Sequence, residues 1–302
     1  MNRREFIRQV AAWSVASAAV PVFKVATLRA ASGNPSVLAV GVGTNYTDLV
    51  QRVVAKVGGM GAFVKRGDKV VVKPNIGWDR SPAQAANTNP EVVRALVQLA
   101  LDHGAKEVLV FDRSCADARR SYRNSGIQQA VEAIHDKRAR CEFIQNWKFV
   151  PVKIQRGKVL HEWPLYRPAL EADCYINVPI AKNHGLTRLT LGLKNTMGVC
   201  GGNRGHIHQQ IPEKLTDLAL VISPKLTVID ATRILLRNGP SGGNLKDVKV
   251  LNTILASTDP VAADAYATTL FGLKPTDIAP TVAAYRRGLG EIDLLKLKIL
   301  KA

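Results

Sequence analysis

Cysteine, aromatic residues, acidic residues and long apolar runs are all scarce in this sequence. The four cysteines of the 302 residues are Cys115, Cys141, Cys174 and Cys200, and none forms a Cys-x-x-Cys pair. Their number excludes a disulfide-dense scaffold, and their spacing argues against a zinc ribbon or a ferredoxin-type cluster. No stretch approaches the roughly 20 apolar residues that a membrane helix needs, so an integral membrane protein is not expected.

The deficit of acidic residues leaves a strongly basic chain. There are 24 acidic residues against 42 lysines and arginines, and the formal net charge is +18. Such a balance favours anionic partners, namely phosphorylated or carboxylate ligands, acidic lipid surfaces or nucleic acid. The basic residues are scattered and aromatic residues make up only 6% of the chain. We therefore predict no specific nucleic-acid interface and expect an anionic small molecule as the partner.

The first 31 residues have the layout of an export signal. Arg3 and Arg4 are followed by Glu5-Phe6-Ile7, a weak apolar run over residues 10–23 and small residues near 30–31. This segment resembles a twin-arginine signal peptide. The resemblance implies export of the folded protein by the twin-arginine translocase to a periplasmic or other extracytoplasmic location. The alternative is an amphipathic first helix of the fold.

Residues 36–295 are predicted to form a single α/β domain. Strand-like and helix-like segments alternate, with apolar residues at helical spacing over 47–57, 90–99 and 260–270. This rhythm predicts a mainly parallel sheet with helices on both faces. Residues near 137–168 break the rhythm, and we predict that they form a small antiparallel insertion with strands at 141–144, 149–154 and 158–160.

Polar residues follow the predicted strands. The strand at 69–72 is followed by Lys73-Pro74-Asn75, the strand at 107–111 by Asp112-Arg113-Ser114, and the strand at 174–178 by Lys182-Asn183-His184. The strand at 226–229 ends at Asp230, and the strand at 250–255 leads to Asp259. The carboxyl ends of parallel strands line the ligand crevice of open sheets, so these residues predict one pocket.

The predicted anion contacts combine lysine cations, side-chain amides and a glycine that allows close backbone approach. The predicted ligand-binding residues are Lys73, Asn75, Lys182, Asn195, Gly198, Asp230 and Asp259. For Asp259, which precedes Pro260, the alternative is a helix N-cap with proline in the first turn.

The predicted catalytic residues are His184, Lys194, His206 and His208. On an extended segment, His206-Ile207-His208 would point both imidazoles the same way. With His184 these histidines could hold a metal ion, or they could act as acid and base near neutral pH. The sequence has no P-loop, GxGxxG, GxSxG or HExxH motif, so a nucleotide fold of those types and a serine hydrolase are not indicated.

Several blocks resemble the domain of unknown function 362 family over roughly residues 36–272. They are VVVKPN at 70–75, TNPE at 88–91, residues 104–112, HGLTRLTLGLKNTMG at 184–198, residues 226–230, Gly239-Pro240 and ASTDPVAAD at 256–264. Some members of this family carry a ferredoxin module of clustered cysteines. This sequence lacks that module, so the resemblance implies no iron–sulphur centre held by this chain alone.

A more distant likeness, at the level of the fold, is to the N-terminal domain of the nickel-pincer lactate racemase family. That family places histidines and a lysine around its cofactor. The likeness implies a metal or organometallic cofactor near His184, Lys194 and one of the two later histidines, and we leave the identity of any cofactor open.

The leading hypothesis is an exported α/β enzyme that binds an anionic small molecule or cofactor at the strand ends. Lysine and asparagine side chains would hold the anion, and histidine would transfer protons. Two other classes stay open. One is a metal-carrying or iron–sulphur accessory protein that works with a redox partner protein, and the other is a non-catalytic periplasmic ligand-binding protein.

Overall fold

The computed structural model describes residues 35–302, so the predicted signal peptide lies outside the described residues. Within this range, a ten-stranded sheet has the order β12-β1-β11-β10-β7-β2-β3-β4, with β8 beside β10 and β9 beside β8. The strands are β1 (Val37–Val42), β2 (Lys69–Pro74), β3 (Glu107–Val110), β4 (Ala139–Cys141), β7 (Cys174–Val178), β8 (Ile180–His184), β9 (Arg188–Thr190), β10 (Leu226–Leu235), β11 (Val248–Ser257) and β12 (Lys298–Lys301).

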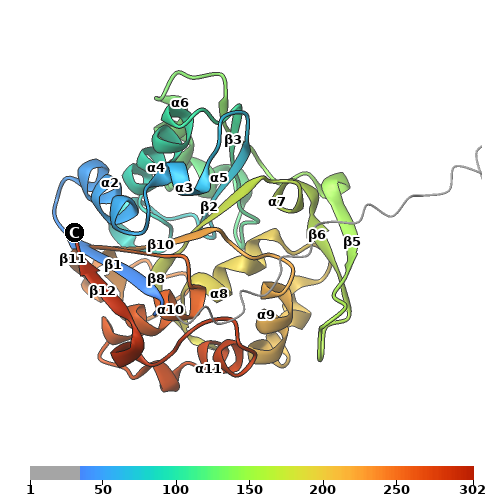
Figure 1. Cartoon of the computed structure of the whole chain (residues 1–302). Helices are drawn as coiled ribbons and strands as arrows, with labels where there is room; N and C mark the ends of the chain where they lie inside the picture. The colour runs from blue at the N-terminus through green and yellow to red at the C-terminus, as the bar shows by residue number, and fades with distance from the viewer. Residues whose placement is uncertain (1–34) are drawn as a thin grey trace, which may run out of the picture.

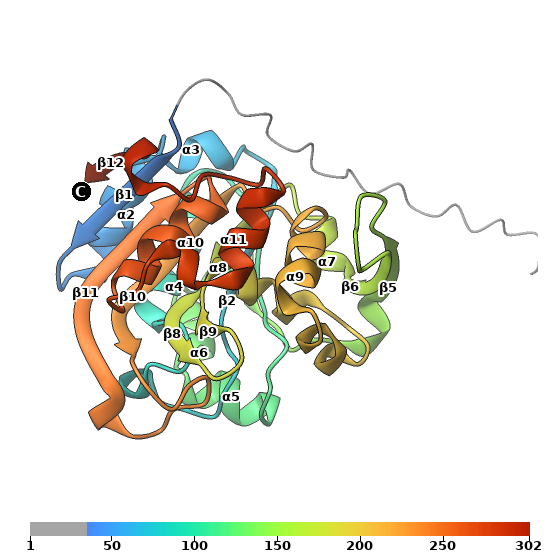
Figure 2. The ribbon, with the colours of Figure 1, turned by 90° about the horizontal axis from the view of Figure 1, so that it is seen from below.

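Helices cover both faces of the sheet (Figure 1). On one face lie α2 (Tyr46–Lys56), α4 (Pro90–Asp102) and α6 (Ile127–Glu132), and on the other lie α8 (Gly192–Asn195), α9 (Ile211–Ala219), α10 (Pro260–Thr269) and α11 (Ala279–Arg286), as Figure 2 also shows. The remaining α-helices of the described chain are α3 (Met60–Phe63), α5 (Ala118–Asn124) and α7 (Arg167–Leu170). The predicted α/β fold with a mainly parallel sheet is confirmed.

Alternation along the central strands explains why both faces are covered. In β2, Val70 and Val72 join the core under α2, α4 and α6, whereas Val71 joins the core under α9. Successive side chains of a strand point to opposite faces, so a run of valines is apolar on both sides. Such a strand is stable only between two layers of helices.

Helix α4 shows how the sequence sets an element that flanks the site. The Asn89 side chain accepts a hydrogen bond from the Glu91 amide at 3.0 Å, and Pro90 occupies the first turn. Asparagine caps and first-turn prolines both favour helix initiation. The helix then buries Leu96 and Val97 against the sheet.

The predicted insertion is present, but its strands differ from the expectation. Strand β5 (Phe149–Lys153) pairs antiparallel with β6 (Glu162–Tyr166), which begins after the predicted 158–160 segment. Strand β4, near the predicted 141–144 strand, pairs in parallel with β3 and so forms the edge of the main sheet. The hairpin lies at the opposite side of the molecule from β12 (Figure 1).

Strand β11 departs from the parallel series. It runs antiparallel to both β1 and β10, so its last residue, Ser257, pairs with Leu38 and Thr227 near the starts of those strands. The expectation that residue 259 lies at the same edge as the other strand ends is therefore wrong. Strand β10 also continues past Asp230 to Leu235, so Asp230 lies inside a strand. None of the helices in residues 35–302 has the length and apolar character needed to cross a membrane.

Candidate functional site

Lys73 lies at the centre of the candidate site and is fully buried. Its Nζ is 2.8 Å from Asp112 Oδ1, and it donates to Pro74 O at 2.7 Å and to Asn195 Oδ1 at 3.1 Å. Burial lowers the pKa of the Lys73 ammonium, and the Asp112 carboxylate opposes this shift. Asp112 Oδ2 also accepts from the Ile76 amide at 2.6 Å. The buried ion pair therefore ties together the carboxyl ends of β2 and β3.

Three asparagines extend this network to β7 and α8. Asn195 Oδ1 accepts from Lys73 and, at 3.2 Å, from Asn75 Nδ2. Asn195 Nδ2 donates to Asn177 Oδ1 at 2.8 Å and to the Lys73 carbonyl at 3.2 Å. Every polar atom of the buried Asn195 side chain thus has a partner, as burial of an amide requires. Asn195 acts as a bridge between strands.

Lys182, on β8, is the second buried lysine. Its Nζ donates to Asn75 Oδ1 at 3.1 Å and to the Ala86 carbonyl at 2.5 Å. Burial, with smaller contributions from the Lys194 and Lys73 charges, lowers the pKa of Lys182 to about 7. Removal from water disfavours the charged form of a lysine, and neighbouring cations add to the effect.

Gly198 is required by packing against the ion pair. A Cβ at this position would lie 1.8 Å from Asp112 Oδ1 and 2.5 Å from Lys73 Nζ. The Gly198 carbonyl accepts a hydrogen bond from the Arg113 amide at 3.1 Å. Glycine at residue 198 therefore leaves room for the Lys73–Asp112 contact.

Lys194 differs from the other two lysines. It is half-buried, and its Nζ donates to Met197 Sδ at 3.0 Å, a weak acceptor. Burial and the Arg204 charge lower the pKa of Lys194 to about 8. Across residues 35–302, Lys194 forms no salt bridge. The Lys194 ammonium therefore has a thioether sulfur, and no oxygen atom, as its hydrogen-bond acceptor among the described residues.

His184 is buried beside this lysine and is neutral. Its Nδ1 accepts hydrogen bonds from the Leu186 amide at 3.1 Å and the Thr187 amide at 3.4 Å. Burial, followed by the Lys194 and Lys182 charges, lowers the pKa of His184 to about 3. A neutral ring with an accepting Nδ1 carries its proton on Nε2. His184 therefore offers an N–H donor.

His208 has the complementary arrangement. Its ring is stacked on that of His184 with centroids 6.2 Å apart and planes 17° apart. Its Nδ1 lies 3.3 Å from the Gly205 carbonyl, which accepts only from a protonated nitrogen. Burial, with the Lys194 charge next, lowers the pKa of His208. A neutral His208 thus presents an unprotonated Nε2, so the two histidines form a donor and acceptor pair.

Two arginines complete the basic surroundings. Arg204 donates to the Arg113 carbonyl at 2.6 Å, to the Ser114 carbonyl at 3.3 Å and to Cys115 Sγ at 3.2 Å. Arg113 in turn donates to the Cys200 carbonyl at 2.7 Å. These bonds fix the Arg204 guanidinium against the loop that follows β3 and the Arg113 guanidinium against the segment at residues 200–202.

His206 is not part of the histidine pair. The segment 204–208 is a 3₁₀ helix, η4 (Arg204–His208), and not the extended strand that the sequence analysis assumed. His206 is exposed and contacts Asn203 at 3.1 Å, whereas His208 faces His184. With three residues per turn, positions two apart point in different directions. Within residues 35–302, no group of three or more His, Cys, Asp or Glu side chains is placed to hold a metal ion.

The two predicted acidic contacts occupy structural positions. Asp230 is fully buried and accepts from the Asn89 amide at 2.7 Å and from the Thr232 amide and hydroxyl at 2.9 and 2.7 Å. Asp259 caps α10 by accepting from the Val261 and Ala262 amides, each at 2.9 Å. These contacts match the N-cap alternative that the sequence left open for Asp259.

The structure also brings in residues that the prediction of site residues did not include. They are Asp112, Cys115, Asn177, Arg113 and Arg204. Asp112 and Arg113 follow β3 after Phe111, and the strand-end argument placed them at the predicted pocket without giving either of them a role. Asn177 lies within the apolar β7 strand, and a buried asparagine in such a strand is a signal of a polar network.

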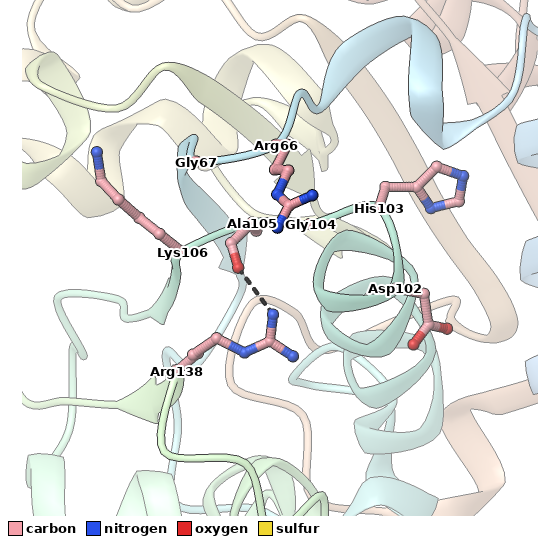
Figure 3. Close-up of a pocket in the computed structure, with 8 residues that line it drawn as sticks. All are labelled: Arg66, Gly67, Asp102, His103, Gly104, Ala105, Lys106 and Arg138. Carbon is pink, nitrogen blue, oxygen red and sulfur yellow. Dashed lines mark hydrogen bonds between the residues drawn. The ribbon is translucent and has the colours of Figure 1, made fainter.

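A hollow of about 550 Å³ lies at the opposite, amino-terminal ends of β2 and β3 (Figure 3). Its lining is Arg66, Gly67, Asp102, His103, Gly104, Ala105, Lys106 and Arg138. Arg138 there donates to the Leu101 carbonyl in the last turn of α4 at 3.5 Å and to the Ala105 carbonyl at 3.2 Å, and it pairs with Asp136. This arginine covers the carboxyl end of α4, which is a structural role. The basic cluster at the other end of the strands therefore remains the candidate site.

Comparison with known protein families tests the family resemblance that the sequence motifs indicated. The sequence model of a family described as "Domain of unknown function (DUF362)" matches residues 70–269. The chain belongs to the DUF362 family. This DUF362 protein is also 30% identical over 253 residues to a thylakoid-associated protein of Synechocystis sp., and the alignment covers 79% of this chain and 73% of that relative. The family predicted from the sequence motifs is confirmed.

Solved structures show more distant similarity to the DUF362 chain. A Thermotoga maritima protein of known crystal structure has a TM-score of 0.42 at 13% identity, with 76% of this chain and 60% of that one covered. The lactate racemase apoprotein from Thermoanaerobacterium thermosaccharolyticum has a TM-score of 0.42 at 11% identity, with 75% and 55% covered.

Proposed function

We propose that this DUF362 protein is an enzyme that binds an anionic small molecule between Lys194, Arg204 and the His184–His208 pair. The observation that carries the proposal is the half-buried Lys194 ammonium, whose hydrogen-bond partner is a thioether sulfur. A partly desolvated cation next to a second cation is costly, and an anion would relieve that cost. The depressed pKa of Lys194, about 8, has the same origin.

The hydrogen bonds within the site indicate which residues would contact the ligand and which position the others. Lys73 uses its donors on Asp112, Pro74 and Asn195, so it positions the site and does not contact the ligand. Lys194 and Arg204 would hold the anion. The Nε2–H of His184 would donate to an oxygen that gains negative charge, and Nε2 of His208 would accept a proton. Preplaced donors of this kind lower a barrier because they need no rearrangement during the reaction.

Anion affinity tests this proposal. We expect Lys194→Ala to bind a carboxylate such as pyruvate about tenfold to a hundredfold more weakly, because it removes a charged contact of about 1.5–3 kcal/mol. Calorimetric titration against wild type would measure the change. The matched control is Lys106→Ala, an exposed lysine in the hollow at the opposite strand ends. Equal affinity in Lys194→Ala and wild type would refute the assignment.

We also propose that the protein works outside the cytoplasm after twin-arginine export, as its first 31 residues suggest. Fractionation of the native cells tests this location, and recovery of the protein only in the cytoplasm would contradict it.

A further inference from the structure

The three lysines of the site differ in what their amino groups can do. Lys73 and Lys182 are 0% and 1% exposed, and both donate to oxygen atoms at 3.1 Å or less. Lys194 is half-buried and its Nζ contacts Met197 Sδ. Of the three, only Lys194 belongs to a partly exposed side chain and has an amino group without an oxygen partner among the described residues. A lone pair on its nitrogen would therefore be available to an incoming molecule.

The surroundings of Lys194 favour the uncharged amine. Burial of the side chain, with a smaller contribution from the Arg204 charge, disfavours the ammonium and lowers the pKa of Lys194 to about 8. At pH 7 the neutral fraction of such a lysine is roughly one tenth. For a lysine with an ordinary pKa of about 10.4, the neutral fraction at pH 7 is less than about a thousandth. A lysine that is desolvated and next to another cation is the kind that attacks carbonyl groups.

We propose that Lys194 forms an imine with a carbonyl group of the substrate, and that the substrate is a 2-oxo acid. This inference rests on the proposed anion site, because the carboxylate of such a substrate would pair with Arg204. The carbonyl carbon would then lie at Nζ of Lys194, and its oxygen would face the histidine pair. A 2-oxo acid satisfies both features of the site, since it is an anion and an electrophile in one small molecule.

The chemistry balances with groups that the site contains. The Lys194 Nζ lone pair attacks the carbonyl carbon, and the electron pair of the C=O bond moves to oxygen, which accepts from the His184 Nε2–H. The nitrogen loses one proton to His208 Nε2. The oxygen regains that proton together with one from solvent and leaves as water, while the nitrogen forms the C=N bond. The product is a protonated imine and one water molecule.

Reductive trapping tests the imine. Wild-type protein is mixed with pyruvate and sodium borohydride, which reduces an imine to a stable secondary amine, and the adduct is located by peptide mass spectrometry. We expect one adduct per chain on Lys194, with a trapping rate that rises from pH 7 to pH 9 as the amine loses its proton. Propanoate, which has the carboxylate of pyruvate but lacks its 2-oxo group, should give no adduct.

The variant Lys194→Arg separates the imine from the charge. Arginine keeps the cation and cannot form the imine, so we expect pyruvate binding to persist within about threefold while the adduct disappears. Binding of pyruvate to wild type without any adduct, or an adduct spread over exposed lysines such as Lys106, would overturn the inference and leave the anion site intact. Failure of both pyruvate and propanoate to bind wild type would instead overturn the proposed function, and the imine with it.

Discussion

At the scale of single residues, the site depends on a contact between two side chains that are far apart in sequence. Lys73 and Asp112 are both buried and lie 2.8 Å apart. A buried charge that loses its partner is strongly destabilising, because the remaining charge is neither hydrated nor paired. The room for this pair is provided by the missing side chain at Gly198.

The first prediction at this scale concerns the space that Gly198 leaves for the Lys73–Asp112 ion pair. We expect Gly198→Ala to lower the free energy of unfolding by about 3–5 kcal/mol, the usual cost of breaking a buried ion pair. Urea unfolding would measure it. Gly185→Ala is the control, because a Cβ there meets no atom within 4 Å. A Gly198→Ala protein as stable as the control would show that the Lys73–Asp112 pair can move aside without loss of stability, which would contradict the prediction.

The sequence predicted which lysines and asparagines lie at the strand ends, but not how their work is divided. Lys73 and Lys194 both follow apolar segments, and the apolar residues before them do not show which lysine has oxygen acceptors for its amino group. The fold brings the distant Asp112 and Asn195 to Lys73, whereas the acceptor of Lys194 is Met197, three residues further along the same helical segment. The catalytic and ligand-binding roles stay predictions until the variants are measured.

At the scale of elements, direction was the property that the sequence analysis missed. An apolar run such as β11 has the same composition whether it runs parallel or antiparallel to its neighbours. The connection between Leu235 of β10 and Val248 of β11 contains only a short 3₁₀ turn, η5 (Leu245–Asp247), and no crossover α-helix. Parallel neighbours need a crossover connection, so this loop was the available signal of an antiparallel pair.

Asp259 carries the prediction for this scale. Because it caps α10 and also accepts from the Ser36 hydroxyl at 2.6 Å and the Glu291 amide at 2.9 Å, we expect Asp259→Ala to cost about 1–2 kcal/mol of stability. Thermal unfolding and pyruvate titration would be run on the same sample. Anion affinity should equal that of wild type. Weakened pyruvate binding with unchanged stability would contradict the capping role and support the predicted ligand-binding role of Asp259.

At the scale of the whole molecule, buried lysines make stability depend on pH. The folded-state pKa of Lys182 is lowered to about 7, whereas an unfolded lysine titrates near 10.4. Between these values the unfolded chain binds more protons than the folded one, so the free energy of unfolding rises with pH across this window. Below pH 7 Lys182 is protonated in both the folded and the unfolded protein, so it adds nothing to the rise of the free energy of unfolding with pH.

We therefore expect wild type to gain stability relative to Lys182→Met as the pH rises from 7 to 10, by an amount on the order of a few kcal/mol. Lys73 and Lys194 shift in the same direction, so the difference between the two proteins isolates Lys182. Denaturant unfolding at several pH values would measure it. Two parallel stability curves would mean that Lys182 stays charged in the folded protein.

The place of β1 in the sheet has a consequence for the order of events during synthesis. Its two neighbours are β11 and β12, and its residues Val37–Val42 pair with partners from Thr253 onward. The first described strand of the chain thus stays without a ladder partner until the residues of β11 from Thr253 onward have left the ribosome. Contacts this distant along the chain slow folding and prolong the exposure of an unpaired strand. The sheet is therefore completed only after β12 has left the ribosome, and a chaperone that shields the nascent strand would have most effect on this part of the molecule.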